Sequence, residues 1–175
     1  MKKLLLISIF LIASASMFAQ GQQKIGYVDS QIILAQYAPA IKAQSDLDAI
    51  AAKFTKTRDS MVTVLQTAYA DYEKQKEMMT PDKQREMQQS LVAKQQTIQK
   101  FEQEKFSQQG GQLYAKNEEL FAPVKAKIMD TINEVAKEEG MHFIFDKTGE
   151  VLLLYADADF DLTYKVLDRL KRTKK

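Results

Sequence analysis

The sequence predicts an α+β protein that is mostly helical, with a long antiparallel helical hairpin and a small β-containing body. The predicted hairpin, residues 39–123, is poor in glycine, rich in charge, and carries apolar residues at seven-residue spacing, which is typical of coiled coils. Pro81 divides that stretch into two halves of 42 residues each. Short apolar runs that are typical of strands lie on either side of it, so residues 24–38 and 124–175 are predicted to form the body.

Residues 1–19 are predicted to be a secretory signal peptide. Two lysines precede an apolar run from Leu4 to Ala13, which is too short to span a bilayer, and small residues follow it. We expect cleavage after Ala19 or after Ser16. The mature chain is therefore expected to be exported and soluble, and because it has no cysteine it forms no disulfide.

The charge balance argues against nucleic-acid binding. Without the two lysines of the signal peptide, the chain has 23 basic and 23 acidic residues, so the mature protein is expected to be neutral.

The side-chain inventory also argues against an enzyme. With no cysteine and a single histidine, His142, the chain readily assembles neither a zinc site nor a histidine-based triad. We expect no catalytic residues, no metal and no cofactor.

Asp157, Asp159 and Asp161 have the spacing that opens a calcium-binding loop. Leu162 then occupies the position that such a loop needs for glycine. Helix capping is therefore the favoured interpretation, with Asp157 or Asp159 expected to cap the last helix.

The first body segment begins with a strand at residues 24–29, in which apolar and polar side chains alternate. Asp29 or Ser30 is predicted to cap a short helix that stops at Pro39. From there the first long helix begins. Its apolar residues recur in two rows, Leu47, Phe54, Met61 and Ala68, and then Ala51, Leu65, Tyr72 and Met79.

The first helix is predicted to end near Met79, where the return helix begins at once. Thr80 is a favourable N-cap, and Pro81 suits the first helical position. A hairpin that turns at Pro81 brings Pro39 and Pro123 to the same height, because each is 42 residues from the turn. At 1.5 Å per residue the hairpin is then about 63 Å long.

The return helix is expected to be irregular at Gly110-Gly111 and at Pro123. These residues are either hinges or tolerated irregularities. Gly140 fits a helix C-cap. Residues 141–146 and 150–155 then read as a β-hairpin around Lys147-Thr148-Gly149. A last amphipathic helix presents an apolar face made of Leu162, Val166, Leu167 and Leu170.

Flexible and aromatic side chains gather towards the predicted turn, where two helices can bury only part of them. Exposed methionine and aromatic groups make adaptable apolar contacts, although the same residues can instead pack the turn. The candidate contact residues are Tyr69, Tyr72, Met78, Met79 and Met87.

The two ends of the mature chain resemble the Skp/OmpH family of periplasmic chaperones. The similar segments are KIGYVDSQIILAQ (24–36) and FIFDKTGEVLLLYADADFDLTYKVLDRLK (143–171), with FEQEK (101–105) and LFAPVKAKI (120–128) between them. The resemblance implies a homotrimer that pools its body strands. The candidate trimer residues are Ile25, Tyr27, Phe143, Phe145, Leu152 and Leu154.

The resemblance also implies an ATP-independent holdase, which keeps unfolded outer-membrane proteins in a cavity between helical arms. The sequence departs from the family at FSQQGG (106–111), where family members carry clustered arginines, so lipopolysaccharide contact has weak support. Two alternatives stay open. One is a cell-envelope adaptor that docks a fixed partner through its coiled coil, and the other is a lipid-surface protein that uses the basic tail, residues 169–175.

Overall fold

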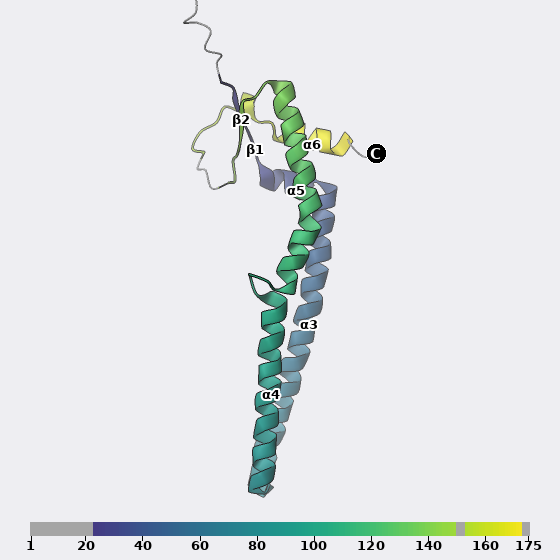
Figure 1. Cartoon of the computed structure of the whole chain (residues 1–175), viewed down its shortest axis with the longest axis vertical. Helices are drawn as coiled ribbons and strands as arrows, with labels where there is room; N and C mark the ends of the chain where they lie inside the picture. The colour runs from purple at the N-terminus through teal and green to yellow at the C-terminus, as the bar shows by residue number, and fades with distance from the viewer. Residues whose placement is uncertain (1–22, 150–152, 173–175) are drawn as a thin grey trace, which may run out of the picture. The chain divides into compact units, whose positions relative to one another are not determined.

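The computed structural model describes residues 23–149 and 153–172 (Figure 1). The predicted signal peptide, residues 1–19, lies outside this range. The predicted fold class is confirmed, since the described part combines long helices with one small sheet. The chain divides into two compact units, Leu34–Met129 and Met1–Ile33 together with Asp130–Lys175.

The unit Leu34–Met129 is an antiparallel helical hairpin. Helix α3 (Ala38–Gln75) runs beside α4 (Pro81–Phe106), and helix α5 (Gln112–Glu139) continues the return direction (Figure 1). The side chains buried in this unit come from both directions of the hairpin, and they are Ala40, Ala43, Leu47, Tyr72, Leu91, Ile98, Val124 and Ile128. Pro39 and Pro123 line one shallow groove, which confirms that they lie at the same height.

The turn of the hairpin is built from Lys76 to Gln84. A 3-10 turn, η2 (Lys76–Met78), follows α3, and the Thr80 hydroxyl accepts a hydrogen bond of 3.4 Å from the Lys83 N–H at the start of α4. The Gln84 side-chain amide donates to the Lys76 carbonyl at 2.6 Å and to the Met79 carbonyl at 3.3 Å. Helix α4 therefore begins where the sequence predicts, and a glutamine from its first turns closes the reversal.

The two expected irregularities of the return helix behave differently. Helix α4 ends at Phe106 and α5 begins at Gln112, so the chain leaves the helix around Gly110-Gly111. Pro123, by contrast, lies inside α5 without ending it. Gly140 follows α5 with a positive φ of 65°, and the Met141 N–H donates to the Ala136 carbonyl at 2.8 Å, which confirms the predicted C-cap.

The other unit contains the sheet. Strands β1 (Ile25–Val28) and β2 (Phe143–Asp146) are parallel, with Ile25 opposite Phe143 and Tyr27 opposite Phe145. The Asp29 carboxylate then accepts a hydrogen bond of 2.9 Å from the Ile32 N–H and so caps helix α2 (Ser30–Gln36). Ile33 of α2 is fully buried.

The predicted β-hairpin is not found in the described residues. Strand β2 pairs with β1 in parallel, and Leu153, Leu154 and Tyr155 form no strand, while residues 150–152 lie outside the described range. Leu154 and Tyr155 are 86% and 84% exposed. A strand is stable when one face packs, and within a single chain these two side chains stay almost fully exposed.

The predicted cap of the last helix is also wrong. Asp157 caps a 3-10 turn, η3 (Ala158–Phe160), by accepting a hydrogen bond of 3.1 Å from the Asp159 N–H. Helix α6 (Thr163–Arg172) begins later, and its first N–H bonds to Asp161 at 2.9 Å. The reason is that Asp161 pairs with Tyr27 at the edge of β1, which delays the helix. The predicted apolar face of α6 is confirmed as buried.

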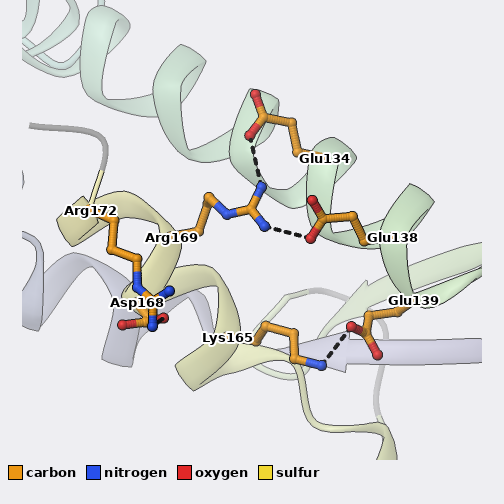
Figure 2. Close-up of polar contacts among 7 residues, drawn as sticks. All are labelled: Glu134, Glu138, Glu139, Lys165, Asp168, Arg169 and Arg172. Atoms are coloured by element: carbon orange, nitrogen blue, oxygen red, sulfur yellow. Dashed lines mark hydrogen bonds and ion pairs between the residues drawn. The ribbon is translucent and has the colours of Figure 1, made fainter. Parts of the chain in front are cut away.

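Ion pairs join α6 to the C-terminal part of α5. Figure 2 shows Arg169 between Glu134 and Glu138, and Lys165 beside Glu139. The hydrogen bond from Arg169 holds the pKa of Glu138 below its usual value. These contacts are solvent-exposed, so the buried apolar face of α6 accounts for most of its attachment.

Candidate functional site

A groove of about 820 Å³ lies between α3 and α4 close to the turn. It is lined mainly by apolar, aromatic and amide side chains. The lining residues are Leu65, Gln66, Tyr69, Ala70, Tyr72, Glu73, Lys76, Gln88, Leu91, Val92 and Gln95. We call this surface the turn-proximal groove.

The floor and the walls of the turn-proximal groove differ in exposure. Tyr72 forms part of the floor, since it is only 7% exposed, and its hydroxyl accepts a hydrogen bond of 2.8 Å from the Gln88 amide. Tyr69 on α3 and Val92 on α4 stand more than half exposed. A ligand in this groove would therefore meet a fixed tyrosine below and apolar side chains at both edges.

The two charged residues in the lining pair with each other. The Lys76 ammonium lies 2.6 Å from the Glu73 carboxylate. The hydrogen bond and the charge of Glu73 raise the pKa of Lys76. The groove therefore offers amide groups and apolar area rather than net charge, which suits a neutral ligand with unpaired backbone groups.

The predicted contact residues separate into two groups. Tyr69 and Tyr72 line the turn-proximal groove together. Met78, Met79 and Met87 are not part of that lining, and Met78 ends η2 with 83% of its surface exposed. Met79 and Met87 are half-buried at the turn and on α4.

Sequence reasoning missed Leu65, Gln88 and Val92 as partners of the two tyrosines. A signal for them was present. In a hairpin that turns at Pro81, residues at similar distances before and after the turn face each other, which places Gln88 and Val92 near Tyr72 and Tyr69. Leu65 lies four residues before Tyr69 and so shares its helix face.

A second apolar surface lies on the sheet. The parallel register and the alternation of strand side chains place Ile25, Tyr27, Phe143 and Phe145 on one face. Tyr27 is buried, whereas Ile25 and Phe143 are 48% and 52% exposed and Phe145 is 37% exposed. We call these four residues the sheet face. Leu154 is also exposed, and Leu152 lies outside the described residues.

The sheet face continues into a shallow pocket that the sequence did not reveal. Tyr155 and Phe160 line this pocket together with Ile25, Tyr27 and Phe145. Burial and the nearby carboxylates of Asp161 and Asp157 raise the pKa of Tyr27, so its phenol stays protonated. The loop after β2 thus adds aromatic area beside the strands.

The described residues contain neither a metal-binding cluster nor a membrane-spanning helix. No three acidic or histidine side chains gather there in an arrangement that would hold a metal ion. The helices of the described ranges are too short or too polar to span a bilayer.

Comparison with known proteins places these features in a family. No curated protein matches the chain. In fold the chain is similar to a crystal structure of an OmpH-like protein from Caulobacter crescentus CB15 that is described as an outer membrane chaperone, with a TM-score of 0.70 and 15% identity over 90% of this chain and 89% of that one. The family model "Outer membrane protein (OmpH-like)" matches residues 24–170. The chain therefore belongs to the OmpH-like family.

Proposed function

We propose that this protein is an ATP-independent holdase chaperone of the periplasm, which binds unfolded outer-membrane proteins and prevents their aggregation. Membership of the OmpH-like family supports a chaperone role. The more specific proposal, that the protein binds unfolded outer-membrane proteins, rests on the turn-proximal groove. This groove is apolar, rich in amide groups and free of net charge. It has the chemistry to hold an unfolded chain without selecting one sequence.

Unfolded outer-membrane strands alternate apolar and polar side chains and expose unpaired backbone groups. Tyr69 and Val92 offer apolar contact at the groove edges, and Gln66 and Gln95 can donate to and accept from a peptide backbone. Each contact is weak, so a client is held by many of them and is released without an energy source.

We further propose that the chain works as a homotrimer whose body, residues 24–38 and 124–175, associates while the arms, residues 39–123, hold the client between them. The sheet face supports association, because a sheet of two short strands is marginal alone and leaves apolar side chains in water. Leu154 and Tyr155 offer further exposed area for the same interface, and Leu152 is proposed to join them.

The direct test is suppression of aggregation when an outer-membrane β-barrel protein is diluted from urea. The wild-type protein should lower light scattering at near-stoichiometric amounts. A variant with Tyr69→Ser and Val92→Ser should lose most of that effect, because both apolar edges of the groove are removed. A control with Thr67→Ser and Glu86→Gln changes exposed residues that do not line the groove, and it should act like the wild type.

Two results would contradict the proposal. One is a folded wild-type protein that leaves the scattering unchanged. The other is saturable binding to a single folded partner with no effect on unfolded chains. That second result would favour the adaptor alternative, in which the exposed Met78 contacts a fixed partner.

A further inference from the structure

A second groove, of about 490 Å³, lies at the end of α3 that is far from the turn. It is bordered by α3, by α5 and by the last residues of α2. Its lining includes Leu34, Ile41, Gln44, Ser45, Asp48 and Phe121. We call this surface the base groove, and it shares no residue with the turn-proximal groove.

The base groove resembles the turn-proximal groove in its chemistry. Ile41 is 51% exposed at its edge, and the half-buried Leu34 and Phe121 add apolar area. The Gln44 amide donates a hydrogen bond of 2.8 Å to the Asp48 carboxylate, so the acidic group of the lining already has a donor. A ligand in the base groove would therefore meet apolar side chains and an amide, as it would close to the turn.

The phase of the helix shows on which side of the hairpin the base groove opens. At this height the buried residues of α3, which face the return direction, are Ala40, Ala43 and Leu47. The base groove is lined by the residues that follow each of them by one position, which are Ile41, Gln44 and Asp48. One position turns a helix by about 100°. The residues one position before the buried ones line the shallow groove on the opposite side, and they are Pro39, Lys42 and Asp46.

The turn-proximal groove opens on the same side as the base groove. Tyr72 faces α4, since it is buried and accepts a hydrogen bond from Gln88. Leu65 and Ala68 lie seven and four residues before Tyr72 and share its helix face. The lining of the turn-proximal groove includes the residues that follow these three by one position, which are Gln66, Tyr69 and Glu73. The rotation away from the facing residues is therefore the same for both grooves.

The same side of α3 offers a passable surface between the two grooves. Phe54 faces the return direction, because its ring meets the Phe101 ring edge-on at a centroid distance of 6.5 Å. Thr55 follows Phe54 by one position and is half-buried. The Asp59 carboxylate lies 2.7 Å from the Arg58 guanidinium. A chain that ran from one groove to the other would meet a small side chain and a paired carboxylate on this path.

The separation of the two grooves matches the length of one extended segment. Gln44 and Tyr69 are 25 residues apart on the unbroken helix α3, which corresponds to about 38 Å. An extended chain covers that length in about 11 residues. The membrane strands of outer-membrane proteins have about 9–11 residues.

We propose that the base groove is a second client site, and that one extended client segment, about as long as a membrane strand, occupies both grooves along one side of the arm. This two-groove site rests on the proposed function, and it adds a path along the arm and a minimum length of client segment. The opposite side of α3, which carries Val64 and Thr67 one position before Leu65 and Ala68, takes no part.

Two fluorescent peptides from one membrane strand of an outer-membrane β-barrel protein test the proposal. One has about 11 residues and can reach both grooves, whereas the other has about five and cannot. Their affinities for the full chain are measured by fluorescence anisotropy. The longer peptide should bind at least about tenfold more tightly to the wild type, because its second contact becomes intramolecular.

Ile41→Ser should reduce that advantage to about twofold or less, because it removes the apolar edge of the base groove and leaves the turn-proximal groove intact. Ser45→Glu, which brings a charge into the base groove from an exposed position, should have the same effect. Val64→Ser is the matched control. It removes an apolar side chain that is 53% exposed on the opposite side, and it should leave both affinities unchanged.

Equal affinities of the two peptides for the wild type would overturn the two-groove site, and so would an equal loss in Ile41→Ser and Val64→Ser. A lower oligomeric mass of both Ile41→Ser and Ser45→Glu would instead assign the base groove to contact between copies of the chain. If neither peptide binds but the wild type still suppresses client aggregation, the two-groove site alone is wrong. If aggregation is not suppressed either, the proposed function fails with it.

Discussion

Individual buried side chains attach α6 to its unit. Leu167 is 1% exposed, and Val166 and Leu170 lie beside it on the buried face. Tyr164 is on the same helix but is 64% exposed. The sequence pattern predicts this division, because the apolar face of a short helix must meet a core.

Leu167→Ala should lower the free energy of unfolding by about 2–5 kcal/mol, because it removes a fully buried side chain and leaves a cavity. Tyr164→Ala is the matched control and should change it by less than about 0.5 kcal/mol. Urea unfolding at one fixed protein concentration measures both, since association adds to the apparent stability. Equal effects of the two substitutions would contradict the described packing.

Asp146 connects strand β2 to the start of α2. Its carboxylate accepts hydrogen bonds from the Ser30 N–H at 3.2 Å, the Thr148 N–H at 3.1 Å and the Thr148 hydroxyl at 2.9 Å. Burial alone would raise the pKa of Asp146, but the hydrogen bonds from Ser30 and Thr148 lower it below its usual 3.8. The ionised carboxylate therefore stabilises the fold above the unfolded-state pKa.

This contribution begins to fall near the unfolded-state pKa of about 4, and it is lost as the pH falls through the lower folded-state pKa. Asp146→Asn should be less stable than the wild type at neutral pH, and the difference in melting temperature should shrink between about pH 5 and pH 2. Asp71→Asn, at an exposed position on α3, serves as the control and should show no such convergence. A constant difference across that range would contradict the role of the carboxylate.

At the scale of elements, the turn of the hairpin depends on one glutamine among many. Gln84 donates to the carbonyls of Lys76 and Met79, whereas Gln89 is exposed on the same helix. Gln84→Ala should speed hydrogen exchange at residues 76–84 several-fold, because two carbonyls lose their donor. Gln89→Ala should leave that exchange unchanged, and equal rates in the two variants would contradict the role of Gln84.

The long elements were predictable from the sequence because their signals are local. Seven-residue spacing predicts α3, and the Thr80-Pro81 pair predicts the start of α4. That residues 153–155 form no strand, and that α6 begins only after Asp161, could not be predicted, because both depend on tertiary pairing. Strand β2 pairs with the distant β1, and Asp161 pairs with Tyr27. Two glycines indicated that the helix is lost at 107–111. The hydrogen bond from the Gly111 N–H to the Ser107 carbonyl, which closes this loop, could not be predicted.

The residues of the candidate site were likewise predictable where the signal is local and not where it depends on tertiary pairing. Tyr69 and Tyr72 could be proposed as contact residues because aromatic residues near a turn stand out in a sequence. Gln88 and Val92 could be placed in the groove only from the pairing of the two helices. The exposed area of the sheet face could not be predicted, because it depends on which residues of the same chain cover the strands.

At the scale of the whole molecule, the sheet face is proposed to hold the trimer together. Phe143→Lys should convert the trimer to a monomer, because it places a charge among apolar side chains that would otherwise be buried. Tyr164→Lys, at a similarly exposed position on α6, should leave the trimer intact. Light scattering coupled to gel filtration measures both masses. A Phe143→Lys variant that stays trimeric would place the interface elsewhere.

We propose that the arm contacts unfolded chains through the turn-proximal groove. Photo-crosslinking residues are placed singly at Tyr69 and Val92, which line the groove, and at Thr67 and Glu86, which are exposed but do not. Each protein is then mixed with a urea-denatured outer-membrane β-barrel protein and irradiated. We predict that the client crosslinks at Tyr69 and Val92 far more than at Thr67 and Glu86. Equal crosslinking at all four positions, or none at any of them, would contradict client binding in the turn-proximal groove.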